Sequence, residues 1–439
     1  MYLKTPRGGS TLTTLMMLGA LLAGCGTEGT APGASEDPEG DDAAEALLSA
    51  LPGPTMKRAE LPALSPVESR RHQEVERYLA RLYRGKRIVE TTQTYGGDII
   101  DWMDPDTVPG SRAEPPPRPS PESLRVAPGK ELQLTELDLF PELRGPRGTI
   151  PMVRPRFEGY VRGETKATSV EDFIGHQEAG QPGGQFRLYG GLASSTVNQS
   201  VVGWFNQFGG DVEPGTFTLM ELTTACRGSN PSTTMELVGI VASRDRANFG
   251  NSDLRLQVEF LSAGASAVGN NVGGWDGVVT GFVPAAGRPY GPGVLLTGSI
   301  VNGTQYESRF EIQRFGANWW INHNGNWLGY YPGALFNLIN SNGCEADWYG
   351  EVFDPTPTNW TWTDMGSGNF SSTGAGKAAY VRDPLYSDAA GVSQWPSGSG
   401  SVVPVDSACY TRSSLFSSAA PWERYFYLGG PGGDVLGCD

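Results

Sequence analysis

The chain has 439 residues, of which 60 are Gly and 33 are Pro, and its formal net charge is −15. So much Gly and Pro disfavours long helices and favours short strands joined by many turns. The negative charge argues against nucleic acid as a partner, because phosphate binding needs a basic surface. Only three His residues are present, which argues against mechanisms that need a His base or several His ligands.

The N-terminus predicts an export signal, residues 1–24. Lys4 and Arg7 precede an apolar run, residues 12–22, that is too short to span a membrane. The run ends in Leu-Ala-Gly-Cys25, the pattern of a bacterial lipobox, so we expect cleavage before Cys25 and acylation of its thiol. An ordinary secretory signal is the alternative. Either signal exports the chain to an oxidising compartment, anchored by lipid to the cell envelope or secreted after processing.

Four cysteines remain after Cys25, and their even number predicts disulfides with three possible pairings. They are Cys226, Cys344, Cys409 and Cys438. No Cys-x-x-Cys or Cys-x-x-His spacing is present, so a zinc site is disfavoured. We expect no metal and no organic cofactor.

Downstream of the signal, residues 25–62 have the Gly, Ala, Glu, Asp and Pro content of a disordered tether. Residues 66–84 show the apolar period of a helix. Residues 87–104 read as two strands around a Gly-Gly turn. A Pro-rich linker follows at residues 114–121. The sequence thus predicts a small α+β segment before the main domain.

From about residue 185 the pattern changes to runs in which apolar and polar residues alternate, such as Leu254–Phe260 and Ser308–Gln313. Turn residues separate many of these runs. This pattern is typical of an antiparallel β-sandwich, jelly-roll-like, with two stacked sheets. We therefore expect residues 185–439 to form an all-β domain.

Four motifs of this domain resemble the neprosin family. They read GANWWINHNGNWLGYYPGALF at 316–336, WYGEV at 348–352, DMGSGNF at 364–370 and YFYLGGPG at 425–432. Upstream, GGDIID at 96–101 resembles the family's activation-peptide motif.

The resemblance implies a secreted glutamic endopeptidase that cleaves after proline at acidic pH. It implies a sandwich fold for residues 185–439 and a blocking pro-segment, residues 63–184. The expected partners are proline-containing peptides or proteins and the chain's own pro-segment as inhibitor, with membrane contact only through the lipid. The Pro182–Gly183 bond lies just before the domain, where a post-proline enzyme can cut its own linker.

Two glutamates carry the chemistry in this family. The one that follows Trp-Gly-Gly corresponds to Glu351, and the one in TIEAGW aligns with Glu236 in TMELVG, where the Gly-Trp after Glu is lost. Glu221 and Glu259, on predicted strands nearby, are the alternatives. Two close carboxyls do not both ionise easily, so one can activate water while the other donates a proton. Activity is then expected to fall once both are ionised.

A site specific for proline needs apolar faces to hold the ring. The aromatic candidates, each of which can equally belong to the sandwich core, are Trp319, Trp320, Tyr330, Trp348 and Tyr349. Cys409–Cys438 resembles the family's C-terminal disulfide. Cys226 and Cys344 each lie close in sequence to a proposed catalytic Glu, so a bridge between them would tie the two catalytic strands together.

Two other functions stay open at this stage. Glu345, Asp347 and Glu351 have even spacings that place them on one strand face, and paired carboxylates beside Trp also suit a glycoside hydrolase. A surface lipoprotein that binds carbohydrate or peptide without turnover is the third interpretation.

Overall fold

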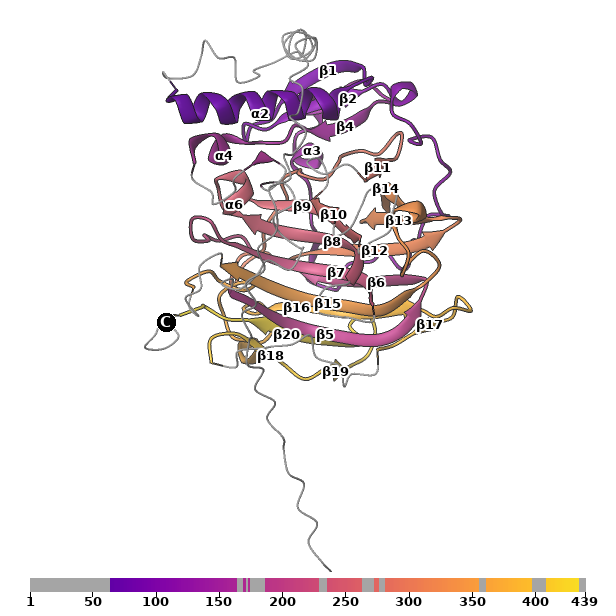
Figure 1. Ribbon diagram of the computed structural model, residues 1–439. Coiled ribbons are helices and arrows are strands. Elements are labelled where there is room, and N and C mark those ends of the chain that lie inside the picture. Colours follow the sequence, from indigo (N-terminus) through magenta and orange to yellow (C-terminus); the bar gives the residue numbers. More distant parts are fainter. Residues whose placement is uncertain are drawn as a thin grey trace, which may run out of the picture.

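The computed structural model describes residues 64–163, 169–170, 173, 186–228, 235–262, 272–275, 281–354, 361–396 and 408–433. The predicted signal peptide, Cys25, the Pro182–Gly183 bond and Cys438 lie outside the described residues. The predicted sandwich is confirmed: two antiparallel sheets stack face to face and make up most of the described chain (Figure 1).

The first sheet has six strands in the order β10-β9-β8-β7-β15-β5. Their bounds are β5 Phe186–Asn198, β7 Phe217–Arg227, β8 Met235–Asp245, β9 Leu254–Ser262, β10 Val272–Trp275 and β15 Gly343–Asp354. β15 inserts between β7 and β5, which precede it by more than a hundred residues, so the centre of this sheet is built from distant segments.

The second sheet has eleven strands, with the main order β11-β14-β13-β12-β6-β16-β20-β18. Their bounds are β6 Ser200–Asn206, β11 Val283–Pro284, β12 Tyr306–Phe315, β13 Asn318–His323, β14 Asn326–Pro332, β16 Ala379–Ser387, β18 Thr411–Arg412 and β20 Arg424–Gly429. β17 Ser393–Gln394 pairs with β16, β19 Phe416–Ser417 with β20, and β3 Glu131–Leu132 runs parallel to β12. Short helices join the strands at α6 Arg246–Phe249, η3 Gly333–Leu335 and η4 Ser371–Thr373.

Alternation along the strands decides which side chains fill the space between the sheets. On β15, Ala346, Trp348 and Val352 belong to the main apolar core, together with residues of every neighbouring strand. The residues between them, Tyr349 and Glu351, point to the opposite face of the sheet. Burying a large apolar side chain stabilises the fold by about 1.5–3 kcal/mol, so the core fixes the direction of the alternate residues as well.

An N-terminal layer covers one end of the sandwich (Figure 1). It holds α2 Pro66–Tyr83, a small sheet of β1 Ile88–Gln93, β2 Ile99–Met103 and β4 Ile150–Val153, and the short helices α3 Glu136–Leu139, α4 Glu158–Arg162, η1 Pro105–Thr107 and η2 Pro141–Leu143. Ser65 caps α2 by a capping box with Glu68, which explains why the helix begins there. The helix and hairpin predicted in this segment are confirmed.

This layer shares the core of the sandwich. Ile100, Trp102 and Leu137 belong to the same apolar cluster as Leu254 and Leu256 of β9. The sequence predicts a domain boundary after residue 184. In the structure, however, the segments before and after this boundary pack into one continuous core.

Candidate functional site

The outer face of the six-stranded sheet, turned away from the second sheet, gathers carboxyl groups from three strands. Tyr349 on β15 lies opposite Glu221 on β7, and Asp347 lies opposite Thr223. Across β8, Gly239 lies opposite Glu259 on β9. We call this set, Glu221, Glu259, Asp347, Tyr349 and Glu351, the carboxyl face.

Glu351 lies on β15, three residues before the strand ends at Asp354, and is 2% exposed. Its direct neighbour on β7 is Leu219, and Glu221 is two residues further along the same face. Such diagonal neighbours are about 7–8 Å apart at the backbone, a span that two Glu side chains can close. The sheet therefore places Glu351 and Glu221 as diagonal neighbours on one face.

Glu221 and Glu259 converge on the space above Gly239. A Cβ added at Gly239 would lie 2.5 Å from Oε1 of Glu221 and 3.0 Å from Oε1 of Glu259. Both glutamates are 1% exposed. A side chain at position 239 would therefore displace the two carboxyl groups.

Asp347 is the second acid of the face that lies on β15. Burial is the main cause that raises the pKa of its carboxyl to about 8, and the nearby charges of Glu345 and Glu221 add to the effect. The Thr223 hydroxyl donates a hydrogen bond of 3.3 Å to Oδ2, whereas Oδ1 has no hydrogen-bond partner in the described part of the chain. At neutral pH Asp347 is therefore a buried, protonated acid.

Two aromatic side chains complete the carboxyl face. The Tyr349 hydroxyl donates a short hydrogen bond to Oε2 of Glu221. Trp275 lies opposite Glu259 and belongs to one apolar cluster with Leu219 and Tyr349. It is 2% exposed, and its indole N–H finds no acceptor among the residues described.

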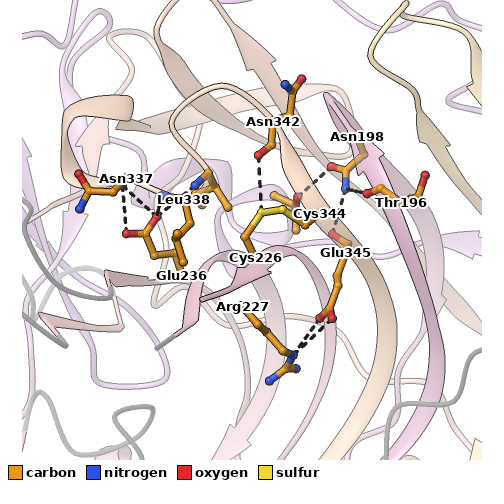
Figure 2. Close-up of a disulfide and its surroundings, with 12 residues drawn as sticks. Thr196, Asn198, Cys226, Arg227, Glu236, Asn337, Leu338, Asn342, Cys344 and Glu345 are labelled. Carbon is orange, nitrogen blue, oxygen red and sulfur yellow. Dashed lines mark hydrogen bonds and ion pairs between the residues drawn. A yellow bond between two sulfur atoms is a disulfide. The ribbon is translucent and has the colours of Figure 1, made fainter. Parts of the chain in front are cut away.

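Glu236 lies elsewhere. Its carboxylate accepts hydrogen bonds from the backbone N–H groups of Asn337 (3.0 Å), Leu338 (2.6 Å) and Ile339 (3.1 Å), as Figure 2 shows in part. It is fully buried and holds the turn that follows η3. Three N–H groups on one carboxylate make an anchor for the backbone, and they use the lone pairs that a catalytic base needs.

The structure does not bring Glu236 and Glu351 together. The physical reason is that the spacing between Glu236 and the next Gly is one residue longer than in the family motif. In TIEAGW the Glu precedes Gly by two positions, whereas Glu236 precedes Gly239 by three. Side chains alternate along a strand, so Gly239 belongs to the carboxyl face and Glu236 to the opposite one. Glu236 pairs with Cys226 at the far end of β8.

Of the aromatic candidates, only Tyr349 lies on the carboxyl face. Trp319 and Trp348 are core residues of the sandwich, whose indole N–H groups donate to the carbonyls of Ile339 (2.7 Å) and Val202 (2.8 Å). Trp320 and Tyr330 belong to a separate cluster on the second sheet. The Tyr330 hydroxyl donates to the carbonyl of Gly110 in the N-terminal layer at 3.2 Å.

The Cys226–Cys344 disulfide is confirmed, with 4.8 Å between the Cα atoms, and joins the ends of β7 and β15 (Figure 2). Cys409 is also disulfide-bonded, and its predicted partner Cys438 lies outside the described residues. Glu345, which shares the strand face of Asp347 and Glu351, pairs with Arg227 at 3.2 Å.

The described residues hold no group of three or more His, Cys, Asp and Glu side chains arranged for a metal ion. Within the same residues, no helix has the length and apolar character needed to cross a membrane.

Comparison with known proteins finds one family model that matches part of the chain. The family model described as Neprosin matches residues 226–431.

Among solved structures, the chain is similar to Scytalido-glutamic peptidase with a peptide-based transition-state analogue, at 8% identity and a TM-score of 0.25, over 56% of this chain and 98% of the other. It is similar to SCP-B of the Eqolisin family of peptidases, in complex with a tripeptide, at 7% identity and a TM-score of 0.25, over 55% and 96%. A kappa-carrageenase from Pseudoalteromonas carrageenovora matches at 6% identity and a TM-score of 0.21, over 37% and 53%. These similarities are too distant to assign a function.

Proposed function

Residues 226–431 belong to the Neprosin family, and from this premise we propose that the chain is a glutamic endopeptidase that cleaves after proline at acidic pH. The observation that carries the proposal is the position of Glu351. The glutamate of the WYGEV motif is buried on β15, on a sheet face that holds further carboxyl groups.

Two carboxyl groups suffice for peptide hydrolysis. One, as a carboxylate, takes a proton from water while the water oxygen attacks the peptide carbonyl carbon. The other, as a carboxylic acid, gives its proton to the amide nitrogen as the C–N bond breaks. The products are a carboxylic acid and an amine, and the two groups end with their protons exchanged. The pair works only while one carboxyl is protonated, so activity is expected to be lost as the pH rises.

We further propose that the chain is made as a zymogen. Glu351, Glu221 and Glu259 are 1–2% exposed, so a substrate reaches them only after whatever covers this face moves away. The N-terminal layer touches the same sheet face: Asp98 accepts a 2.7 Å hydrogen bond from Arg255, which lies on β9 on the face that holds Glu259. This buried ion pair therefore holds the layer against the sheet.

Processing and location complete the proposal. In acid the enzyme would cut its own Pro182–Gly183 bond, and the chain would be exported and tethered through Cys25 until that cut frees it. Sequencing of the new N-terminus after acid incubation tests this step. A terminus beyond β5, or no new terminus at all, would contradict it.

The test of the function itself is a panel of proline-containing peptides, incubated with the acid-treated full-length chain from acidic to neutral pH and read by mass spectrometry. We expect cuts after proline at acidic pH. Glu351→Gln should lower kcat/KM about 100-fold or more, the usual contribution of a general acid or base. The matched control is Glu345→Gln, on the same strand and face but paired with Arg227, which should keep activity.

Cleavage that survives in Glu351→Gln would refute the role of this residue. If the acid-treated wild type cuts none of the peptides, the endopeptidase proposal fails. A glycan panel would then separate a glycoside hydrolase from a binding protein.

A further inference from the structure

We propose that Glu221 is the second catalytic glutamate of this chain, with Tyr349 and Glu259 as the residues that position it. The inference rests on the proposed function, since it names the partner that Glu351 needs. It departs from the family pattern, in which the alignment points to Glu236.

Glu221 has the position that a partner of Glu351 requires. Glu221 and Glu351 lie on adjacent strands and on one face, as diagonal neighbours. Glu236 lies on the opposite face of β8, with its carboxylate held by three backbone N–H groups. Of the two, only Glu221 shares a sheet face with Glu351.

Tyr349 fixes the orientation of the Glu221 carboxyl group. The Tyr349 hydroxyl donates to Oε2 of Glu221, which leaves Oε1 directed to the space over Gly239. Tyr349 itself precedes Glu351 by two residues on β15 and lies directly opposite Glu221 on β7, so it neighbours both glutamates. In the family motif this position is Gly. The added phenol of this chain therefore has a specific task, which is to fix the second carboxyl.

Glu259 lies close enough to Glu221 to share a proton with it. Glu259 approaches the same point from β9, with its Oε1 3.0 Å from the ideal Cβ position of Gly239. Two carboxyls this close in a buried site do not both ionise, so the pair holds one shared proton. Glu221 can then serve as the acid that protonates the leaving nitrogen, while Glu351 as carboxylate activates the water.

The carboxyl face also contains polar atoms that a ligand can bind. The indole N–H of Trp275, 2% exposed, and Oδ1 of Asp347, 7% exposed as a residue, have no hydrogen-bond partner in the described chain. Buried polar groups are rarely left without a partner. A donor N–H and a protonated carboxyl beside the glutamates suit a peptide, whose carbonyl oxygens accept hydrogen bonds.

The step balances with these groups alone. Water gives one proton to Glu351 and its oxygen to the carbonyl carbon. Glu221 gives its proton to the amide nitrogen, and the C–N bond breaks. Transfer of the proton from Glu351 back to the Glu221–Glu259 pair, directly or through water, restores the starting state.

The experiment measures kcat/KM against pH for the acid-treated full-length chain and four variants. Glu221→Gln should lose about 100-fold or more at every pH, as Glu351→Gln does. Glu259→Gln should keep much of the maximal rate but shift the high-pH limb of the profile to lower pH, because the neighbouring charge that holds the proton on Glu221 is gone. Gly239→Ala should separate the two carboxyls and lower kcat rather than raise KM. Tyr349→Phe should change the pH profile without abolishing activity.

The matched control is Glu236→Gln, which should destabilise the fold and leave the pH profile of the folded fraction unchanged. Melting curves identify variants that fail to fold, and Gly239→Ala and Tyr349→Phe, which remove no buried charge, keep the test open in that event. Full activity in folded Glu221→Gln beside an inactive Glu351→Gln would overturn the inference and leave the proposed function standing. An active Glu351→Gln would overturn the proposed function itself.

Discussion

Asp347 links the stability of the domain to pH. Its pKa rises from the ordinary 3.8 to about 8, chiefly through burial. Between these two values the folded chain keeps a proton that the unfolded chain has already released. The free energy of unfolding therefore falls as the pH rises through this range, and the loss is complete above the folded pKa.

Asp347→Asn is expected to remove this dependence. The amide cannot ionise, so the variant should unfold at a higher temperature than the wild type above neutral pH, and the difference should shrink towards acidic pH. One pKa unit corresponds to about 1.4 kcal/mol, so even a part of the shift is measurable. Urea unfolding across the pH range provides the values. Parallel curves for the two proteins would refute the assignment. Glu345→Gln should shift the dependence only slightly, because the charge of Glu345 is a smaller cause of the raised pKa of Asp347 than burial.

For Glu236 we predict the opposite result: its replacement should lower the stability of the fold and leave the catalytic step unchanged. Glu236→Ala leaves the N–H groups of Asn337, Leu338 and Ile339 without their acceptor. Each buried donor left unsatisfied costs about 1–3 kcal/mol, so we expect a loss of about 3 kcal/mol or more. Chemical unfolding measures it. A variant as stable as the wild type but inactive would return Glu236 to the catalytic role.

Single residues also show what the sequence could and could not predict. The even spacings of Glu345, Asp347 and Glu351 predicted one shared strand face, and all three residues lie on β15. The odd spacing between Glu236 and Gly239 was visible in the sequence and already separates their faces. The approach of Glu221 to Glu259 was not visible, because it depends on the register of three strands, which is set by the whole sheet.

At the scale of elements, the short alternating strands were predicted from the sequence because period-two patterning is a local signal. The order of the strands was not, since β15 joins β5 and β7 across more than a hundred residues. The tryptophans show the same limit. Trp319 and Trp348 carry the apolar character of a binding slot, but only the stacking of the sheets shows that they fill the core.

The disulfide between β7 and β15 is predicted to stabilise the pairing of these two strands. It closes a loop of 118 residues at the end of the strand pair that carries Glu221 and Glu351. Replacing Cys226 and Cys344 together by Ala should cost about 2–4 kcal/mol of stability. Chemical unfolding, with mass spectrometry to verify the oxidation state, measures it. An unchanged midpoint would mean that the strand hydrogen bonds alone hold this end of the sheet.

For the whole molecule, the shared core predicts how a cut chain behaves. Leu137 is fully buried in the main cluster, together with Ile100 and Trp102 of the N-terminal layer. Cleavage at Pro182–Gly183 should therefore leave the two pieces bound at neutral pH, and they should co-elute in size-exclusion chromatography.

Leu137→Ala is the matched variant for this experiment. A large-to-small change in a core costs about 2–5 kcal/mol, so the pieces of the cut variant should separate more readily than those of the wild type. Elution of the wild-type N-terminal piece by itself at neutral pH would show that the layer is a cover and not part of the core.

The parallel pairing of β3 with β12 has a consequence for biosynthesis. Glu131 finds its partner at Tyr306 and Leu132 at Glu307, so the early segment has no strand to join until the ribosome has made the residues that follow it. Contacts between such distant segments form late and slowly. The segment around Glu131 therefore has no β12 to pair with until residue 306 has been made. We therefore expect this segment to dock only after β12 is available, as the sandwich itself is completed.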